Sequence, residues 1–281
     1  MRRSKSFLTT QALAGCFAGA LPVLADEAPR RVVSMNLCTD QLAMLLAAPG
    51  QLISVSRIAL DPVSSAMSEE AAAYSINAGQ AEEIFAMSPD LVLGGTYTDP
   101  FAVQMLRDLG VEVVQFPIVS RLSEIPDVVR QMGVALGREA KADALAREVE
   151  ARLEAMSATP DERRLEAAFF FANGYSLGAG TLSHDIVSKA GFLNLAERLG
   201  RQGGGRLALE ELILNRPDVL ITGQPYPAAS RSEEILAHPA LDGILRVASG
   251  PEWVCGTPLT LLALEQMVAV RKALELSLIH I

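Results

Sequence analysis

The sequence predicts an α/β protein with two lobes, each built around a mainly parallel sheet, joined by one long, rigid α-helix. Three observations lead to this prediction. A pattern of 14 residues occurs twice, at 82–95 and at 210–223. Each copy has a helical stretch, a Pro-Asp turn and a continuous apolar run ending at glycine, which is typical of a strand buried on both faces. Between the copies, residues 123–158 have a helical pattern of unusual length.

The repeat indicates two related lobes rather than a stack of small units. The copies are offset by 128 residues, and five of the 14 aligned residues are identical. Solenoid proteins need several short repeats that stack on one another, whereas this pair is single and widely separated. Two similar lobes that face each other form a cleft, and clefts of this kind commonly hold binding or catalytic sites.

Strands and helices alternate within each half of the chain, as in parallel α/β sheets. In the first half we expect strands at 31–35, 52–55, 91–95 and 111–116, helices at 39–47 and 100–109, and a loop-rich stretch at 61–78. In the second half we expect strands at 167–171, 219–223 and 245–247, helices at 183–190, 233–237 and 260–276, and a flexible glycine-rich loop at 200–206.

The long helical pattern lies between these halves. Its second part has apolar residues at steps of three and four, which places them on one helix face: Ala142, Leu145, Ala146, Val149, Leu153 and Met156. A helix is a stiff connector, so we expect little movement between the lobes. The predicted organisation is a signal peptide at 1–25, an N-terminal α/β lobe at 26–121, a connecting helix region at 122–160, and a C-terminal α/β lobe with a terminal helix at 161–281.

The first 25 residues have the pattern of an export signal. Arg2, Arg3 and Lys5 precede an apolar stretch, and small residues before position 26 suit cleavage after Ala25. The alternative is that this segment forms a buried N-terminal helix. Residues 13–16 also have the form of a lipoprotein box ending at Cys16, but the apolar segment before that cysteine is short and interrupted by polar residues. We therefore expect soluble export rather than lipid anchoring.

Charge and cysteine content narrow the function classes. The formal net charge is −9, and the three positive charges of the presequence leave −12 for the remainder. An acidic exported protein without a basic stripe is a poor candidate for binding nucleic acid or anionic lipid. After cleavage, Cys38 and Cys255 are the cysteines that remain, an even count in an oxidising compartment. A disulfide, two unpaired core thiols and a soft-metal site are all open alternatives.

Together, the presequence, the Arg-Val-Val-Ser run at 31–34, the two Pro-Asp strands and the connecting helix resemble one family. It comprises the periplasmic substrate-binding proteins of ABC importers for ferric siderophores, haem or cobalamin. The resemblance implies two Rossmann-like lobes with a shallow ligand cleft, no catalytic residues and no intrinsic cofactor. It also implies a monomer in the periplasm, a metal chelate as ligand, and an ABC permease dimer of the inner membrane as partner.

One residue pair carries over from the family. Its members have a surface glutamate on each lobe that docks onto permease arginines, and the matching positions are Glu82 and Glu210. Two carboxylates at equivalent points of similar lobes suit a dimeric permease. The alternative is that first-turn glutamates only stabilise the helix N-terminus. The adjacent Glu83 and Glu211 could share or replace the docking role.

Ligands of open α/β sheets bind beyond the carboxyl ends of the strands. At such positions the sequence provides these candidate ligand-binding residues: Asn36, Arg57, Tyr97, Tyr175, Tyr226 and Trp253. The aromatic members favour a flat, partly apolar ligand, with packing of the cleft wall as the alternative. Arginine suits an anionic ferric siderophore, although exposed arginines such as Arg206 and Arg231 are usually only solvated.

The competing class is an exported two-lobe enzyme with thiol redox or hydrolytic activity. A Gly-x-Ser-x-Gly pattern occurs at residues 174–178, in an expected loop rather than at the sharp strand-to-helix turn of a serine hydrolase, and the sequence lacks the Cys-x-x-Cys pattern of a thiol oxidoreductase. His184, His238 and His280 do not have metal-ligand spacing, which also argues against a bound metal ion. We therefore predict a binding protein without catalytic activity.

Overall fold

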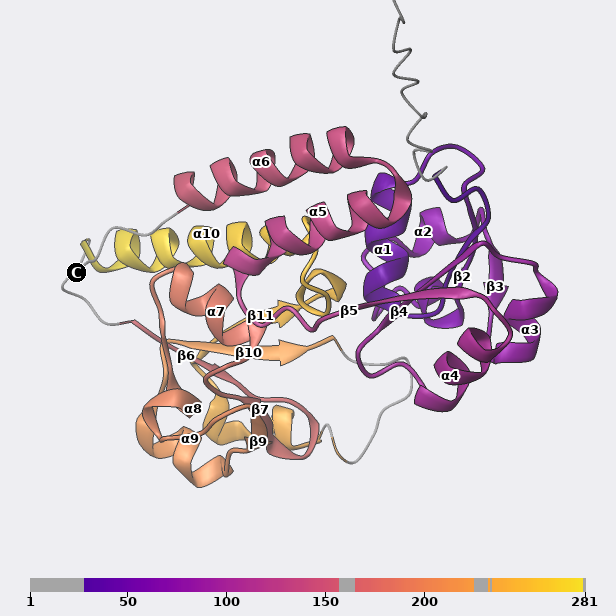
Figure 1. Ribbon diagram of the computed structural model, residues 1–281. Coiled ribbons are helices and arrows are strands. Elements are labelled where there is room, and N and C mark those ends of the chain that lie inside the picture. Colours follow the sequence, from indigo (N-terminus) through magenta and orange to yellow (C-terminus); the bar gives the residue numbers. More distant parts are fainter. Residues whose placement is uncertain (1–27, 157–164, 225–231, 233, 280–281) are drawn as a thin grey trace, which may run out of the picture.

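A computed structural model describes residues 28–156, 165–224, 232 and 234–279. These residues form two α/β lobes that lie side by side, with helix α10 (Thr260–Ile279) along one edge (Figure 1). The predicted signal peptide, the lipoprotein box at Cys16 and the candidate Tyr226 lie outside the described residues.

The N-terminal lobe contains a five-stranded parallel sheet in the order β3-β2-β1-β4-β5. Its strands are β1 (Val32–Ser34), β2 (Leu52–Ser56), β3 (Ser75–Asn77), β4 (Leu91–Gly95) and β5 (Glu112–Phe116). Its helices are α1 (Leu37–Leu46), the 3-10 turn η1 (Arg57–Leu60), α2 (Ser68–Ala71), α3 (Ala81–Ala86) and α4 (Pro100–Asp108).

The C-terminal lobe contains a four-stranded parallel sheet in the order β11-β10-β6-β8 and a small antiparallel pair, β7-β9. Its strands are β6 (Glu166–Phe169), β7 (Tyr175–Leu177), β8 (Leu193–Asn194), β9 (Gly204–Arg206), β10 (Val219–Gly223) and β11 (Leu245–Ser249). Its helices are η3 (Ala172–Gly174), α7 (Leu182–Lys189), α8 (Leu195–Arg198), α9 (Leu209–Asn215), η4 (Glu234–Ala237), η5 (Pro239–Leu241) and η6 (Pro251–Trp253), followed by α10.

Two stretches that the sequence predicts to be loops contain strands. The segment expected to be loop-rich, 61–78, contains β3, a three-residue strand at the edge of the sheet. The glycine-rich residues expected to form a flexible loop include β9, which pairs with β7 through Tyr175 opposite Arg206. A Cβ on Gly204 would overlap the Tyr175 hydroxyl, so glycine at this position leaves room for the Tyr175 ring across the strand pair.

The connecting region forms two helices instead of the predicted single one. Helix α5 (Ile125–Leu136) ends at Gly137, whose φ of +63° is a left-handed conformation that glycine adopts readily, and α6 (Glu139–Ala155) follows. Figure 1 shows α6 folding back along α5. A Cβ on Gly133 would overlap that of Ala142, so the missing side chain lets the two helices approach closely.

Helix α5 crosses between the lobes, and α6 returns. Near the start of α5, the Leu122 amide donates to Asp185 of α7 at 2.7 Å. At its other end, the Gln51 side chain in the N-terminal lobe donates to the Leu136 carbonyl at 2.8 Å. On α6, Arg152 pairs with Glu265 of α10 at 2.6 Å. The connection is therefore a helix pair attached to both lobes.

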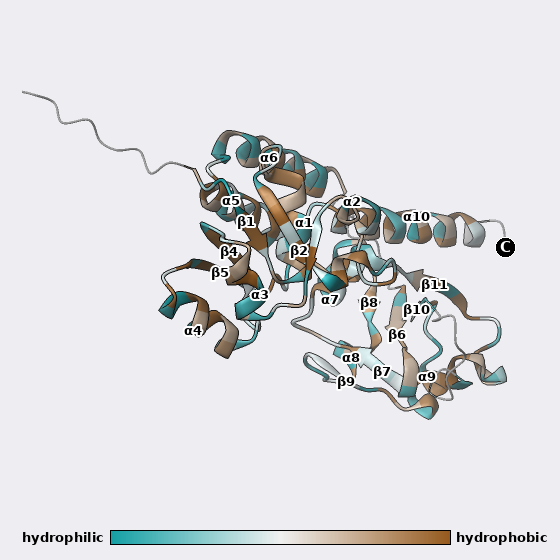
Figure 2. Cartoon of the chain, turned by 90° about the vertical axis from the view of Figure 1, so that its right-hand side faces the viewer, coloured by the Kyte–Doolittle hydropathy of each residue, from teal (hydrophilic) through white to brown (hydrophobic). Residues whose placement is uncertain are grey.

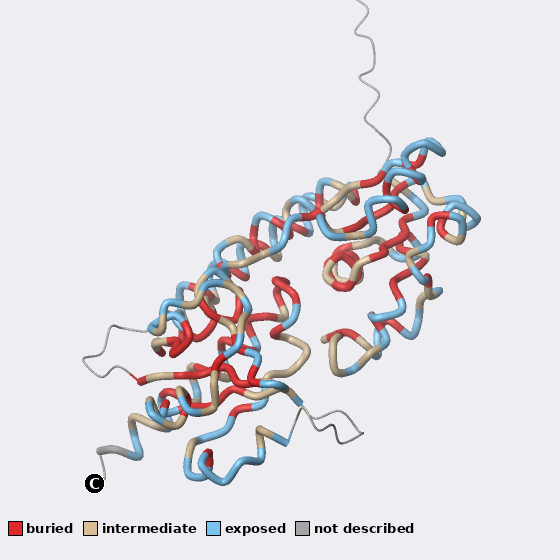
Figure 3. The backbone as a smooth tube through the Cα atoms, turned by 90° about the horizontal axis from the view of Figure 1, so that it is seen from below, coloured by how far each residue is buried: buried red, intermediate tan, exposed pale blue. Residues whose placement is uncertain are grey.

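The two sheets share one apolar core. Alternate strand residues point to opposite faces of a sheet. The inward set from both lobes joins a single buried cluster with α5, α6 and α10, and it includes Val32, Leu91, Leu93, Phe169, Val219 and Ile221. The outward set forms a separate cluster on each lobe, including Val33 and Val92 on one and Phe170 and Leu220 on the other. The central strands are accordingly hydrophobic (Figure 2), and buried residues run through the interior of both lobes (Figure 3).

Among the described residues, no helix combines the length and the apolar composition that a membrane crossing needs.

The contact between α5 and α6 generates a stability prediction. We expect Gly133→Ala to lower the free energy of unfolding by about 1–3 kcal/mol, because the added methyl group overpacks the helix contact. Urea denaturation measures the change. The double variant Gly133→Ala/Ala142→Gly should recover much of the loss, since it moves the methyl group to the other helix. A single variant as stable as the wild type would contradict this account.

Candidate functional site

A pocket of about 280 Å³ lies where strands of the N-terminal sheet end and a segment of the C-terminal lobe reaches across. Its residues follow the carboxyl ends of β1, β4 and β5, where α/β proteins bind ligands. The segment that reaches across comes from the turn between η6 and α10. The wall residues include Asn36, Thr96, Tyr97, Phe116, Ile118 and Val254.

Asn36 is held at the base of this pocket by two contacts. Its side-chain oxygen accepts a hydrogen bond from the Cys38 amide at 3.0 Å and so caps the N-terminus of α1. Its amide lies against Gly95, where a Cβ would come within 3.2 Å of the Asn36 nitrogen. The side chain therefore has a defined orientation before any ligand binds.

The mouth of the pocket is apolar. Tyr97 is 83% exposed, Ile118 is 61% exposed and Val254 is 52% exposed. Exposed hydrophobic residues of this size that surround a hollow are typical of a binding surface. The residues that line the pocket carry no charged side chain. This site is therefore suited to an apolar or uncharged ligand surface.

The pocket brings together two of the six predicted ligand-binding residues, Asn36 and Tyr97. Arg57 is exposed in η1, just after β2, and does not line this pocket. Tyr175 is 49% exposed on the other lobe and packs near Phe171, with ring centroids 6.5 Å apart. Tyr226 lies outside the described residues.

Trp253 requires a correction. It is only 6% exposed and packs edge-on against Phe169, with ring centroids 6.0 Å apart, so it belongs to the shared core and does not face the cleft. The neighbouring Val254 takes the exposed position, because successive residues of the short helix η6 and the turn after it point in different directions. Sequence reasoning also missed residues 117–119, which the strand-end rule would have found after β5.

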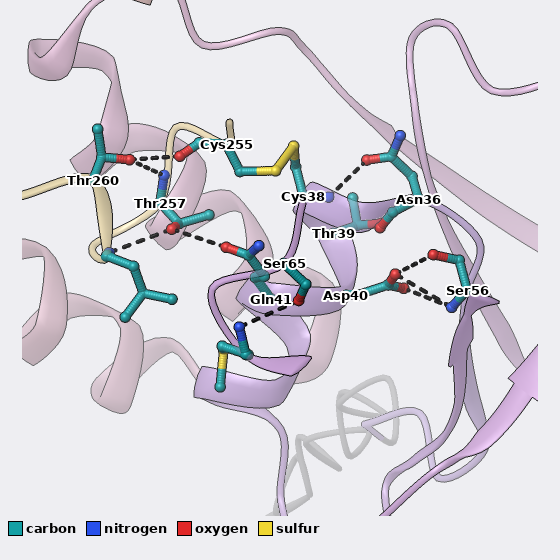
Figure 4. Close-up of a disulfide and its surroundings, with 12 residues drawn as sticks. Asn36, Cys38, Thr39, Asp40, Gln41, Ser56, Ser65, Cys255, Thr257 and Thr260 are labelled. Carbon is teal, nitrogen blue, oxygen red and sulfur yellow. Dashed lines mark hydrogen bonds between the residues drawn. A yellow bond between two sulfur atoms is a disulfide. The ribbon is translucent and has the colours of Figure 1, made fainter. Parts of the chain in front are cut away.

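A disulfide joins Cys38 to Cys255, with Cα atoms 5.3 Å apart (Figure 4). This arrangement corresponds to the first of the three alternatives left open by the sequence. Cys38 lies in the first turn of α1 and lines the pocket, while Cys255 is 2% exposed in the turn before α10. The bond links residues 217 positions apart and ties the C-terminal lobe to the site.

A buried polar network lies next to the disulfide at the carboxyl ends of β1, β2 and β3. Thr39 and Ser34 share a hydrogen bond at 2.8 Å, and Asn77 donates to the Ser34 carbonyl at 2.8 Å. Asp40 accepts hydrogen bonds from the Ser56 amide and hydroxyl (Figure 4). Burial raises the pKa of Asp40 to about 6, although hydrogen bonds from Ser34 and Ser56 act in the opposite direction.

The two glutamates of each repeat copy differ in their contacts. Glu83 accepts from the Ala78 amide at 2.8 Å, and Glu211 accepts from the Ala208 amide at 2.9 Å. Hydrogen bonds from Ala208 and Arg201 lower the pKa of Glu211. These second glutamates stabilise helix starts. Glu82 and Glu210 are exposed at the preceding position and have no hydrogen-bond or ion-pair partner within the described part of the chain.

Within residues 28–156, 165–224, 232 and 234–279, no three or more His, Cys, Asp or Glu side chains gather closely enough to hold a metal ion.

Two α/β lobes joined by a helix pair, with a pocket at the strand ends between them, define a two-lobed binding protein. The comparison with known families agrees with this description. The family model of the periplasmic binding proteins matches residues 32–250. The chain belongs to this family of periplasmic binding proteins.

Individual relatives are distant. The chain is 21% identical over 212 residues to the uncharacterized ABC transporter substrate-binding lipoprotein YvrC of Bacillus subtilis (strain 168), a match that covers 71% of this chain and 65% of that protein. The fold is similar to the periplasmic haem-binding protein HutB of Vibrio cholerae, with a TM-score of 0.70, 20% identity, and coverage of 87% and 98% of the two chains. It is also similar to the periplasmic vitamin B12-binding protein BtuF of Vibrio cholerae, with a TM-score of 0.66, 18% identity, and coverage of 88% and 98%.

The raised pKa of Asp40 generates a prediction about pH. The pKa of Asp40 rises from its ordinary value of 3.8 to about 6 on folding, so protonation favours the folded state. The contribution of this carboxyl to the free energy of unfolding is therefore most favourable at low pH. The contribution is lost as the pH rises through 6. Between pH 5 and pH 7 we expect the wild type to lose about 1 kcal/mol of unfolding free energy relative to Asp40→Asn. Urea denaturation at both pH values measures this difference. The variant Asp242→Asn, at an exposed position, serves as the control. If the difference in unfolding free energy between the wild type and Asp40→Asn does not change with pH, the raised pKa of Asp40 is contradicted.

Proposed function

We propose that this protein is an extracytoplasmic receptor that captures a metal chelate at the pocket and delivers it to an ABC permease. The observation that carries the proposal is the uncharged pocket with an apolar mouth, built at strand ends between two lobes of this family. The wall residues provide no nucleophile paired with a base and no pair of carboxylates, so the site is suited to binding rather than to catalysis.

The character of the pocket wall favours a tetrapyrrole-like ligand, either haem or a corrinoid. An anionic ferric siderophore would leave its charge unpaired against a wall without arginine or lysine, which is costly in a partly desolvated site. The apolar face of a macrocycle would instead cover Tyr97, Ile118 and Val254. Two of the similar structures are named as a haem-binding protein and a vitamin B12-binding protein, which supports this choice, while another is named as an ABC-type Fe3+-hydroxamate transport system.

A macrocycle is larger than the pocket, so only part of it would enter. Its remaining surface would extend along the cleft toward Tyr175, whose half-exposed ring stands on the other lobe. The exposed Arg57 is available for a peripheral carboxylate or phosphate of the ligand. Such a site needs little rearrangement, because Asn36 and the disulfide are already fixed.

Delivery would use the two exposed glutamates. Glu82 and Glu210 stand at the second position of equivalent helices, one on each lobe, and their neighbours already cap those helices. Each free carboxylate would pair with an arginine on one subunit of a dimeric permease. We further propose that the receptor is a monomer, exported by residues 1–25 rather than anchored at Cys16.

The first test concerns ligand binding. We expect the mature protein to bind haemin or cyanocobalamin, followed by absorbance and by calorimetry respectively, and to bind the siderophore ferrichrome far more weakly. Tyr97→Ala should weaken binding about tenfold or more, because it removes the largest exposed contact at the pocket mouth. Tyr97→Phe distinguishes stacking, which it preserves, from a role of the phenol oxygen. Phe101→Ala, an equally exposed aromatic that does not line the pocket, is the matched control. Binding of ferrichrome alone would overturn the choice of ligand class.

The second test concerns delivery. Glu82→Lys/Glu210→Lys should abolish stimulation of the partner permease in proteoliposomes while leaving the affinity for haemin or cyanocobalamin unchanged, because charge reversal at both contacts replaces attraction with repulsion. The matched control reverses Glu69 and Glu70, which are exposed on α2 outside the repeat. Lost ligand affinity would mean that the glutamates belong to the pocket, and unchanged stimulation would exclude them from docking.

A further inference from the structure

Residues 254–257, here named the latch, belong to the C-terminal lobe by chain order but contact the N-terminal lobe. Val254 and Gly256 line the pocket, and Cys255 is bonded to Cys38 of α1. The Thr257 hydroxyl donates to the side-chain oxygen of Gln41, also on α1, at 3.4 Å (Figure 4). One wall of the pocket is therefore a segment of one lobe held on the other.

The latch fits closely against the N-terminal lobe. A Cβ on Gly256 would overlap the side chain of Val119, in the stretch after β5 that forms the adjoining pocket wall. The Gly256 backbone consequently takes the space that a side chain would otherwise occupy. A small displacement of the latch would change both the width of the pocket and the position of Val254.

The latch is anchored on both sides in the C-terminal lobe. Trp253, just before it, is buried against Phe169, and α10 begins at Thr260, whose hydroxyl bonds the Cys255 carbonyl and accepts from the Thr257 amide at 3.1 Å. Its noncovalent hold on α1 is weak by comparison, because a hydrogen bond of 3.4 Å is long. The disulfide is the strong attachment.

We propose that the latch is an affinity-determining wall of the ligand pocket and that the Cys38–Cys255 disulfide is the positioning element that keeps it closed against the N-terminal lobe. The ligand part of this inference rests on the proposed function. Reduction by a dithiol cleaves the S–S bond, transfers two electrons and two protons to give two thiols, and leaves the reductant as its own disulfide. The latch then keeps only its noncovalent contacts with the N-terminal lobe, the long hydrogen bond to Gln41 and the packing of Gly256 on Val119, so we expect the pocket wall to be less firmly held.

The first experiment needs no ligand. Hydrogen–deuterium exchange is measured on the oxidised protein, on protein reduced with dithiothreitol, and on Cys38→Ser/Cys255→Ser. We expect faster exchange, by about tenfold or more, in peptides that cover residues 254–259 and the start of α1, with the sheets unchanged. Dithiothreitol should have no further effect on the double variant. Unchanged exchange at the latch, or a uniform increase over the whole chain, would overturn the positioning role.

The second experiment measures affinity for haemin and cyanocobalamin. Reduction, Cys38→Ser/Cys255→Ser and Gly256→Ala should each weaken binding about tenfold, because each displaces the preorganised wall. Gly256→Ala keeps the disulfide. It therefore distinguishes the effect of a displaced latch on affinity from the effect of losing the cross-link. Val134→Ala, exposed on α5 away from the pocket, is the control. Equal affinity of the oxidised and reduced proteins would overturn the proposal. Failure of the oxidised protein to bind either probe would instead contradict the proposed function, while the exchange result would still test the attachment of the latch.

Discussion

One apolar core, shared by both sheets, is the constraint on which the rest of the structure depends. The inward residues of β4 and β10 belong to one buried cluster, to which α5 contributes Val129 and Met132. Each fully buried side chain of this size contributes roughly 1.5–3 kcal/mol by leaving water. Separation of the lobes would expose this shared surface. Burial of this shared surface therefore keeps the two halves of the cleft at a stable distance. The helix pair connects the lobes as part of the same core.

Much of the fold could be predicted from the sequence because strands buried on both faces leave a clear pattern. The Pro-Asp turns before β4 and β10 are followed by apolar runs that mark each strand. The break at Gly137 could not be predicted, since a glycine in a helical pattern is compatible with continuation, and the left-handed conformation arises from packing of α6 against α5. Strand β9 was missed because two of its three residues are glycines, which carry no periodic signal, and its partner β7 was missed because three residues are too few to show a period.

The site was predictable to the extent that chain topology decides it. Asn36 and Tyr97 line the pocket because each follows a strand of the same parallel sheet. Trp253 was assigned wrongly, because the direction of a side chain within a short turn depends on which neighbour enters the core. The pairing of Cys38 with Cys255 needed a distance between segments 217 residues apart, which only the folded chain provides. Some residues line the pocket only because the two lobes pack together, and reading the sequence one strand at a time does not predict them.

The burial of Trp253 has a spectroscopic consequence. It is the single tryptophan of the chain, and its indole packs on Phe169 two positions before the disulfide-bonded cysteine. Its fluorescence therefore has one origin, an apolar interior site, and emission at longer wavelength would signal water entering the shared core. The same indole is placed to transfer excitation energy to an absorbing ligand in the nearby pocket without touching it. Intrinsic tryptophan fluorescence of this protein thus reports directly whether the interior is intact. It reports ligand in the pocket only by energy transfer, without contact between the indole and the ligand.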